Sequence, residues 1–153
     1  MKTLLKKTVF ALTALVAVSL TVTGCEDEHK IKAEKLPEAT RTFISQYFSG
    51  LDIVTAYKDR DDGVISYDVR LSDGTEIDFD EAGTWTSVDC NLSPVPDGIV
   101  PEPILTHLGT YVEGGTQVFK IERILGGYEV KIADGRELIY GSDGTFVRVD
   151  SDR

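Results

Sequence analysis

The chain has 153 residues, of which 41% are hydrophobic, and a formal net charge of −10 with an isoelectric point near 4.6. This length can build one domain, or two very small ones that share a core, and it excludes a large multidomain enzyme. Because acidic side chains dominate and no basic stripe interrupts them, a phosphate backbone is repelled and nucleic acid is not expected as a partner.

The first 24 residues have the pattern of an export signal. Lysines at positions 2, 6 and 7 precede an apolar run, TVFALTALVAVSL, which is shorter than the roughly 20 residues that a membrane-spanning helix needs. The sequence VTGC at 22–25 follows and resembles the lipobox of bacterial lipoproteins. The resemblance implies that residues 1–24 are removed and that Cys25 is lipidated. We therefore expect a lipid anchor in the bacterial envelope, at the outer membrane, on its periplasmic or surface face.

The mature chain is more acidic than its precursor. The signal segment holds three of the 16 basic side chains and no acid, so 13 basic and 26 acidic side chains remain, a net charge of −13. The mature chain opens with CEDEHKIKAEK at 25–35, which is charged and almost without apolar residues. Such a segment cannot build a core, so we expect a solvated, lipidated tether.

The rest of the chain repeats itself. RLSDGTEIDFDEAGTWTSVD at 70–89 is matched by KIADGRELIYGSDGTFVRVD at 131–150, an offset of 61. Before a gap of three near Val64 the offset is 64, as for Val54 and Val118. The match indicates two copies of one structural unit. The expected domains are repeat 1 at 36–90, a linker at 91–99 and repeat 2 at 100–150.

Each copy begins with a helix signature. Pro37 and Pro101 suit the first helical position, and Gly50 and Gly114 suit the residue just past the last turn. Between these limits one helical face is apolar and must be buried. Its residues are Ala39, Phe43, Ile44, Tyr47 and Phe48 in the first copy, and Ile104, Leu105, Leu108, Tyr111 and Val112 in the second.

Four strands are predicted after each helix. They are IVTAYKD, ISYDVRL, TEIDFD and TWTSVD in the first copy, and VFKIERI, YEVKI, RELIY and TFVRV in the second. A three-residue loop at 72–74 places Arg70 opposite Glu76 and gathers the apolar residues on the other face. The same register places Lys131 opposite Glu137. The predicted class is α+β, with two tandem α-β-β-β-β units, each a helix packed on a four-stranded antiparallel sheet.

This combination resembles the PepSY-like family of β-lactamase-inhibitor-like exported bacterial lipoproteins. The resemblance rests on the Leu36-Pro37 and Val100-Pro101 helix starts, the hairpins YDVRLSDGTEIDFDEAGTW and YEVKIADGRELIYGSDGTF, their tandem order and the lipobox. It spans nearly all of the mature chain. It implies two units side by side in one broad sheet with the helices on one face, and a role in binding or inhibiting other exported proteins. It implies no catalytic residue.

Catalytic and metal-binding motifs are absent from the sequence: it has no Gly-rich phosphate loop, no H-E-x-x-H and no G-x-S-x-G. Glu76, Asp78 and Asp80 alternate along one strand, so their carboxylates share a face, as a two-carboxylate active site would require. At the matched positions of the second copy only Glu137 is acidic. The loop KDRDDG lacks the ligand spacing and the closing Glu of a calcium loop. We therefore expect a non-enzymatic protein without a cofactor or a metal site.

The single cysteine and the histidines of the mature body also favour structural roles. Cys90 has no histidine near it in the sequence, and we expect a small, partly buried residue that closes a strand. His107 takes the place of Phe43 and is predicted at the edge of the packed helical stripe.

The face of the doubled sheet that points away from the helices is the predicted docking surface for an exported or envelope protein. Trp85 and Phe146 begin the last strand of each copy. A two- or four-residue turn before them puts both on this face as binding anchors, and a three-residue turn puts both in the core. Other functions left open are a structural or sensory component of an envelope assembly, and a hydrolase. Alternation assigns to this face Asp68, Arg70, Glu76, Asp78, Glu129, Lys131, Glu137 and Ile139.

Overall fold

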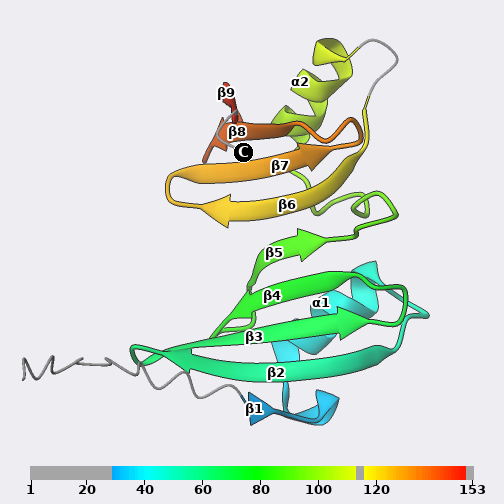
Figure 1. Cartoon of the computed structure of the whole chain (residues 1–153), viewed down its shortest axis with the longest axis vertical. Helices are drawn as coiled ribbons and strands as arrows, with labels where there is room; N and C mark the ends of the chain where they lie inside the picture. Colours follow the sequence, from blue (N-terminus) through cyan, green and yellow to red (C-terminus); the bar gives the residue numbers. More distant parts are fainter. Residues whose placement is uncertain (1–28, 113–115, 151–153) are drawn as a thin grey trace, which may run out of the picture.

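The computed structural model describes residues 29–112 and 116–150, so the predicted signal peptide, Cys25 and Gly114 lie outside the described residues. Nine strands form one antiparallel sheet in chain order, from β1 to β9 (Figure 1). The elements are β1 (His29–Lys30), η1 (Ala33–Lys35), α1 (Glu38–Tyr47), β2 (Ile53–Asp61), β3 (Val64–Leu71), β4 (Glu76–Asp80), β5 (Trp85–Asp89), α2 (Glu102–Tyr111), β6 (Val118–Ile124), β7 (Gly127–Ile132), β8 (Glu137–Gly141) and β9 (Phe146–Asp150).

The predicted α+β class is confirmed, since a helix followed by four antiparallel strands occurs twice. Each helix begins directly after its proline, Pro37 or Pro101, and has ten residues. The two four-stranded groups are not separate sheets, because β5 of the first pairs with β6 of the second.

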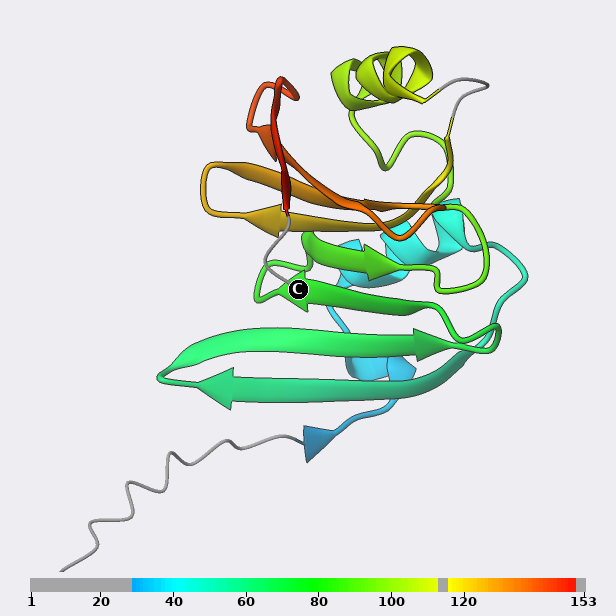
Figure 2. The same ribbon diagram turned by 45° about the horizontal axis from the view of Figure 1, so that its top comes forward.

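Both helices cover the same face of the sheet (Figure 2). Phe43 of α1 packs edge-on against Phe79 of β4, with ring centroids 5.7 Å apart, and His107 of α2 packs against Tyr140 of β8 at 5.6 Å. Between these contacts a row of fully buried residues crosses five strands and forms the centre of the core. Its members, each opposite the next, are Ile77, Val88, Ile121, Val130 and Leu138.

The predicted register of the central hairpins is confirmed. Arg70 lies opposite Glu76, and Lys131 lies opposite Glu137. The Leu71 N–H donates to the Thr75 carbonyl over 2.8 Å and closes the three-residue loop. Gly74 takes a φ of +91° there, which a residue with a Cβ adopts only with strain.

Part of the predicted tether belongs to the fold. β1 pairs with β2, where His29 lies opposite Lys58, and the Ile31 N–H donates to the Ala56 carbonyl over 2.8 Å. Leu36 is buried in the core. Residues 29–35 are therefore ordered against the sheet, because the apolar Ile31 and Leu36 bracket the charged stretch and β2 offers a free edge.

The predicted match of Val54 with Val118 is wrong by one residue. Val118 pairs with Ile132 just before a bulge, and Ile53 takes the same place opposite Leu71. Val54 is 57% exposed, whereas Val118 is buried. The second copy has one more residue between its helix and its first strand, so the offset there is 65.

The predicted linker also contributes to the core. Val95 and Ile99 are buried, and the Val95 N–H donates to the Val118 carbonyl over 2.8 Å. The segment between the two copies therefore packs against β6.

Candidate binding face

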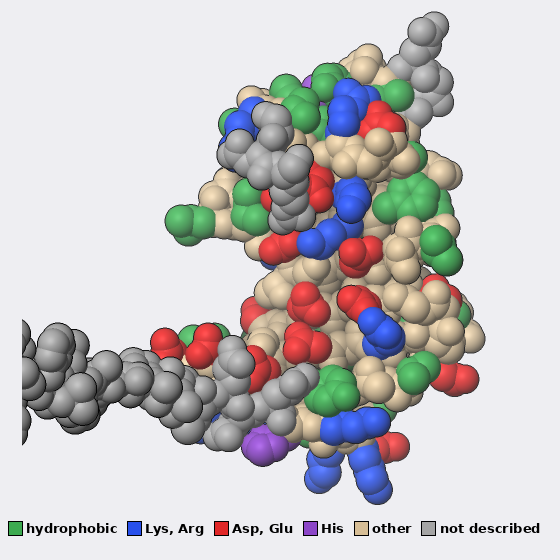
Figure 3. Space-filling view, viewed as in Figure 1, with side chains coloured by type: hydrophobic (Ala, Val, Ile, Leu, Met, Phe, Trp, Pro, Cys, Tyr) green, Lys and Arg blue, Asp and Glu red, His purple; other side chains and the backbone are tan. Residues whose placement is uncertain are grey.

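The sheet face opposite the helices carries two rows of mostly polar side chains that cross the strands (Figure 3). We call the first the acidic row: Tyr57, Asp68, Asp78, Ser87, Glu122, Glu129, Ile139 and Arg148, each opposite the next. We call the second the mixed row: Thr55, Arg70, Glu76, Asp89, Lys120, Lys131, Glu137 and Asp150. The register across the eight strands from β2 to β9 thus brings both copies onto one continuous surface.

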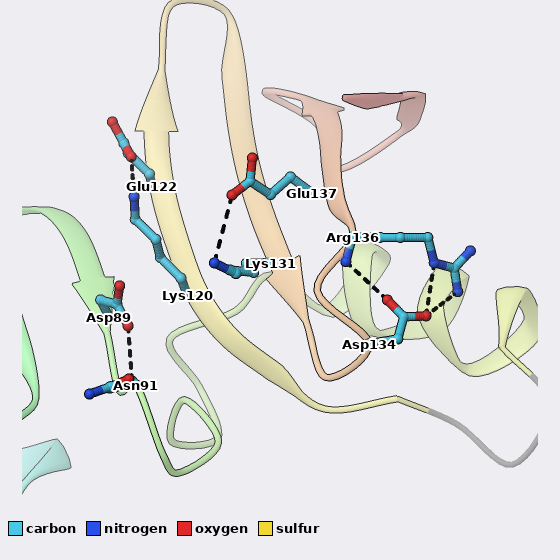
Figure 4. Close-up of polar contacts among 8 residues, drawn as sticks. All are labelled: Asp89, Asn91, Lys120, Glu122, Lys131, Asp134, Arg136 and Glu137. Atoms are coloured by element: carbon cyan, nitrogen blue, oxygen red, sulfur yellow. Dashed lines mark hydrogen bonds and ion pairs between the residues drawn. The ribbon is translucent and has the colours of Figure 1, made fainter. Parts of the chain in front are cut away.

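Opposite charges meet along the mixed row. Arg70 forms an ion pair with Glu76, and Lys131 Nζ lies 3.9 Å from Glu137 Oε1 (Figure 4). These are the two charge pairs that the sequence predicted. They are partly exposed to water, so each contributes at most about 1 kcal/mol to stability.

The acidic row has an excess of negative charge. Asp68 and Asp78 lie directly opposite each other on β3 and β4, and Glu122 and Glu129 do so on β6 and β7. The only basic residue of the row, Arg148, lies at its far end. Like charges opposite each other repel. The mixed row also has such pairs, Glu76 with Asp89, Lys120 with Lys131 and Glu137 with Asp150, but three basic side chains offset its four acids. The acidic row has one basic side chain for four acids, so the repulsion there is less compensated.

The surroundings of Asp78 perturb its titration. Burial, the largest cause, and repulsion by Asp68, Glu122 and Glu76 together raise the pKa of its carboxyl from 3.8 to about 6. Lys120 lowers the pKa of Asp78, but by less than any of these. Lys120 is instead held by Glu122, to which its ammonium donates over 2.9 Å (Figure 4). Burial lowers the pKa of Lys120, but this hydrogen bond and the nearby carboxylates outweigh burial and raise it.

A hollow of about 520 Å³ opens beside Asp78 on the strands β2 to β4. Its wall combines the carboxylates with an aromatic ring, from Tyr57, and an apolar side chain, Val54, which is 57% exposed. An acidic hollow with an apolar rim can accept the long side chain of a lysine or arginine, whose stem is apolar and whose head is cationic. The full lining is Val54, Thr55, Tyr57, Asp68, Val69, Arg70, Glu76 and Asp78.

All eight residues that alternation assigned to this face lie on it by register: Asp68, Arg70, Glu76, Asp78, Glu129, Lys131, Glu137 and Ile139. Ile139 is nearly buried, at 7% exposure, and does not belong to the core under the helices.

Trp85 and Phe146 do not lie on the open face. The Asp80 N–H donates to the Thr84 carbonyl over 2.9 Å, so the turn before Trp85 has three residues. The turn places Trp85 opposite Phe79 on the helix side, where it is 9% exposed. The same turn in the second copy places Phe146 on the helix side, and a bulge after each residue restores the alternation. The two- or four-residue turn that would have put both residues on the open face is therefore excluded, and neither residue is a docking anchor there.

Both aromatic residues instead complete the packing around the helices. The Arg123 guanidinium lies 4.2 Å from the centroid of the Trp85 ring. Phe146 stacks on His107 with centroids 4.6 Å apart, and His107 Nδ1 lies 3.0 Å from the Tyr140 hydroxyl. This is the edge-of-stripe position that the sequence predicted for His107.

Cys90 has the surroundings of a structural residue. It is 3% exposed, and burial raises the pKa of its thiol to about 11, so the nucleophilic thiolate is scarce at neutral pH. Across residues 29–112 and 116–150, no group of three or more His, Cys, Asp or Glu side chains is placed to hold a metal ion. Within the same ranges no helix is long and apolar enough to cross a membrane.

Sequence reasoning missed Tyr57, Lys120 and Glu122, all of which belong to the first strand of a copy. For Lys120 and Glu122 the missing information was the register between β5 and β6, which joins the copies, whereas Tyr57 reaches the face through the pairing of β2 with β3. Aligning the apolar Val88 with Ile121 would have supplied the register of β5 with β6, because that pair continues the buried row.

Residues 65–148 match the family described as "Putative beta-lactamase-inhibitor-like, PepSY-like", and the chain belongs to this PepSY-like family. No curated protein is significantly similar to it.

Three solved structures from Bacteroides, all described as "putative" periplasmic proteins, share the fold. One of the DUF2874 family from Bacteroides vulgatus is 32% identical with a TM-score of 0.78, and the match covers 84% of this chain and 100% of that one. One described as a "putative calcium-regulated periplasmic protein", from Bacteroides thetaiotaomicron, is 31% identical with a TM-score of 0.76, and the match covers 82% of this chain and 98% of that one. One of unknown function from Bacteroides vulgatus is 30% identical with a TM-score of 0.77, covering 81% and 99%.

Proposed function

We propose that this protein is a non-catalytic binding module of the bacterial envelope, and that an exported protein with basic side chains docks on its open sheet face. The observation that carries the proposal is the acidic row, in which the half-buried Asp78 is repelled by Asp68 and Glu122, and also by Glu76 of the mixed row. Carboxyl groups whose pKa is shifted by burial and by like charges are concentrated at functional sites. A cationic partner would relieve the repulsion.

The arrangement suits association more than catalysis. Charge of one sign on a broad face steers an oppositely charged partner and accelerates its encounter. The hollow at Tyr57 and Asp78 provides a place for one buried cationic anchor. The family description as β-lactamase-inhibitor-like supports a role in binding another exported protein.

Localisation forms the second part of the proposal. The relatives' description as periplasmic supports export. The VTGC sequence supports a lipid anchor on Cys25. If the anchor is correct, Cys25→Ser releases the protein from membranes on cell fractionation, and tight membrane association of this variant contradicts it.

The partner is sought with the mature chain, residues 25–153, made without lipid as Cys25→Ser. We expect it to capture a stoichiometric envelope protein that is eluted by salt, because exposed charge pairs are screened at high ionic strength. Capture should fail with Asp78→Asn and persist with Asp97→Asn, which removes one exposed carboxylate from the linker. Equal capture by both variants removes the acidic row from the site. Since one relative is described as calcium-regulated, the capture is repeated with and without calcium.

A further inference from the structure

The outer edge of β9 is exposed, although its counterpart in the first copy is not. β5 pairs with β6 on its outer side, and three of its five residues are buried. β9 is the last strand of the sheet and pairs only with β8 among the described strands (Figures 1 and 2). Phe146 is 37% exposed and Val147 is 58% exposed. An uncovered strand edge is a template for pairing with another chain.

The backbone of β9 is oriented for such pairing. Just past β5, the Cys90 N–H donates to the carbonyl of Phe119 on β6 over 2.9 Å. Residues two apart on an antiparallel strand point their backbone groups the same way, so Val88 also faces β6, where it pairs with Ile121. Val149 takes the place of Val88, because it lies opposite Leu138 as Val88 lies opposite Ile77. The backbone N–H and C=O of Val149 therefore point to the free edge.

We propose that a second copy of this chain pairs with β9, antiparallel, about a two-fold axis at Val149. In this register Arg148 of each copy lies opposite Asp150 of the other, and both side chains are on the open face. The edge is therefore complementary to itself, as an isologous dimer requires. An axis at Arg148 would instead place two arginines opposite each other.

The two-fold pairing limits the assembly to two copies. It uses the β9 edge of both chains, so no β9 edge remains free and the pairing closes after one step. At the other end of the sheet, β1 pairs with the middle of β2, where His29 lies opposite Lys58 and Lys30 opposite Tyr57. Five residues bury little surface, so the dimer is expected to be weak, with a Kd in the micromolar range.

The test is sedimentation velocity of the mature chain with Cys25→Ser, which retains every described residue. We expect a monomer–dimer equilibrium that depends on protein concentration. Arg148→Asp should raise the dimer Kd about tenfold, because the new aspartate of each copy then lies opposite Asp150 of the other, which creates two repulsive contacts across the interface. Adding Asp150→Arg to that variant should restore the wild-type Kd. Arg70→Asp, which makes the same charge change on an inner strand, should leave it unchanged.

A second variant tests the backbone. Val149→Pro removes an N–H that points outward and no hydrogen bond to β8, so it should abolish the dimer while circular dichroism changes little. Loss of the half-buried Val149 side chain opposite Leu138 should lower the monomer's thermal transition only slightly. A wild-type chain that stays monomeric to millimolar concentration overturns the proposal, as does a dimer that Arg148→Asp and Val149→Pro both leave intact. Capture of only an extended segment of another protein at this edge would also overturn it.

Discussion

Asp78 costs the fold free energy at neutral pH, and Asp78→Asn measures that cost. The pKa of its carboxyl rises from 3.8 to about 6 on folding. A rise of this size corresponds to about 3 kcal/mol for a fully buried group. Because Asp78 is only half-buried, solvent screening reduces the cost to about 1–2 kcal/mol.

The direction of the pH dependence of stability follows from the number of protons that the folded and unfolded chains bind. The pKa is higher in the folded state, so between pH 3.8 and about 6 the folded chain binds more protons than the unfolded chain. The contribution of this group to the free energy of unfolding therefore falls as the pH rises through that window, and stays low above it. Below pH 3.8 the carboxyl is protonated in both states and the cost vanishes.

Urea denaturation of the wild type and of Asp78→Asn at several pH values is the assay. We expect the variant to be more stable by about 1–2 kcal/mol at pH 7.5, and the two to converge near pH 3.5. Asp97→Asn serves as the control and should track the wild type throughout. A variant that is less stable than the wild type at pH 7.5, or a difference independent of pH, would refute the reasoning.

Three further predictions concern the packing. Thr40 is fully buried and its hydroxyl has no hydrogen-bond partner among the described residues, so Thr40→Val should raise the free energy of unfolding by about 1 kcal/mol in urea. Gly144→Ala should lower the free energy of unfolding by about 1–2 kcal/mol, because the new Cβ would lie 2.8 Å from the Cβ of Pro103. Gly135→Ala is the control and should lower the free energy of unfolding less, because it introduces only the backbone strain of a positive φ. The thiol of Cys90, with its pKa raised to about 11, should react with iodoacetamide at pH 8 at least about tenfold more slowly in the folded Cys25→Ser chain than in urea, and equal rates would contradict its burial.

The central hairpins could be predicted from the sequence because their turns contain the determining information. Asp73 accepts a hydrogen bond from the Thr75 N–H over 2.9 Å, and Gly74 supplies the positive φ. Both features are local, so the register and the pair of Arg70 with Glu76 follow directly from them.

The last hairpin of each copy could not be settled in the same way. Gly83 suits a positive φ in turns of more than one length. In the fold a Cβ on Gly83 would lie 2.9 Å from the Thr40 hydroxyl oxygen and 3.0 Å from Pro37, so the turn is held by its packing under α1. That contact is tertiary, and the side on which Trp85 lies depends on it.

The candidate site was only half predictable for a related reason. Asp78 and Glu137 follow from alternation within a hairpin, whereas Glu122 and Lys120 reach the face through the pairing of β5 with β6. A helix and a linker separate these strands in the sequence. Their register is set by the way the two copies share one core.

The affinity of the captured partner for paired variants tests the open face most directly. Asp68→Asn with Asp78→Asn removes two charges from the acidic row, and Asp61→Asn with Asp97→Asn removes two from a hairpin tip and the linker. Our account predicts that the first pair raises the Kd at least about tenfold at low salt and flattens its salt dependence, while the second pair leaves both within about twofold. If the variant with Asp68→Asn and Asp78→Asn binds the partner as tightly as the wild type, with the same salt dependence, the acidic row is not the binding site.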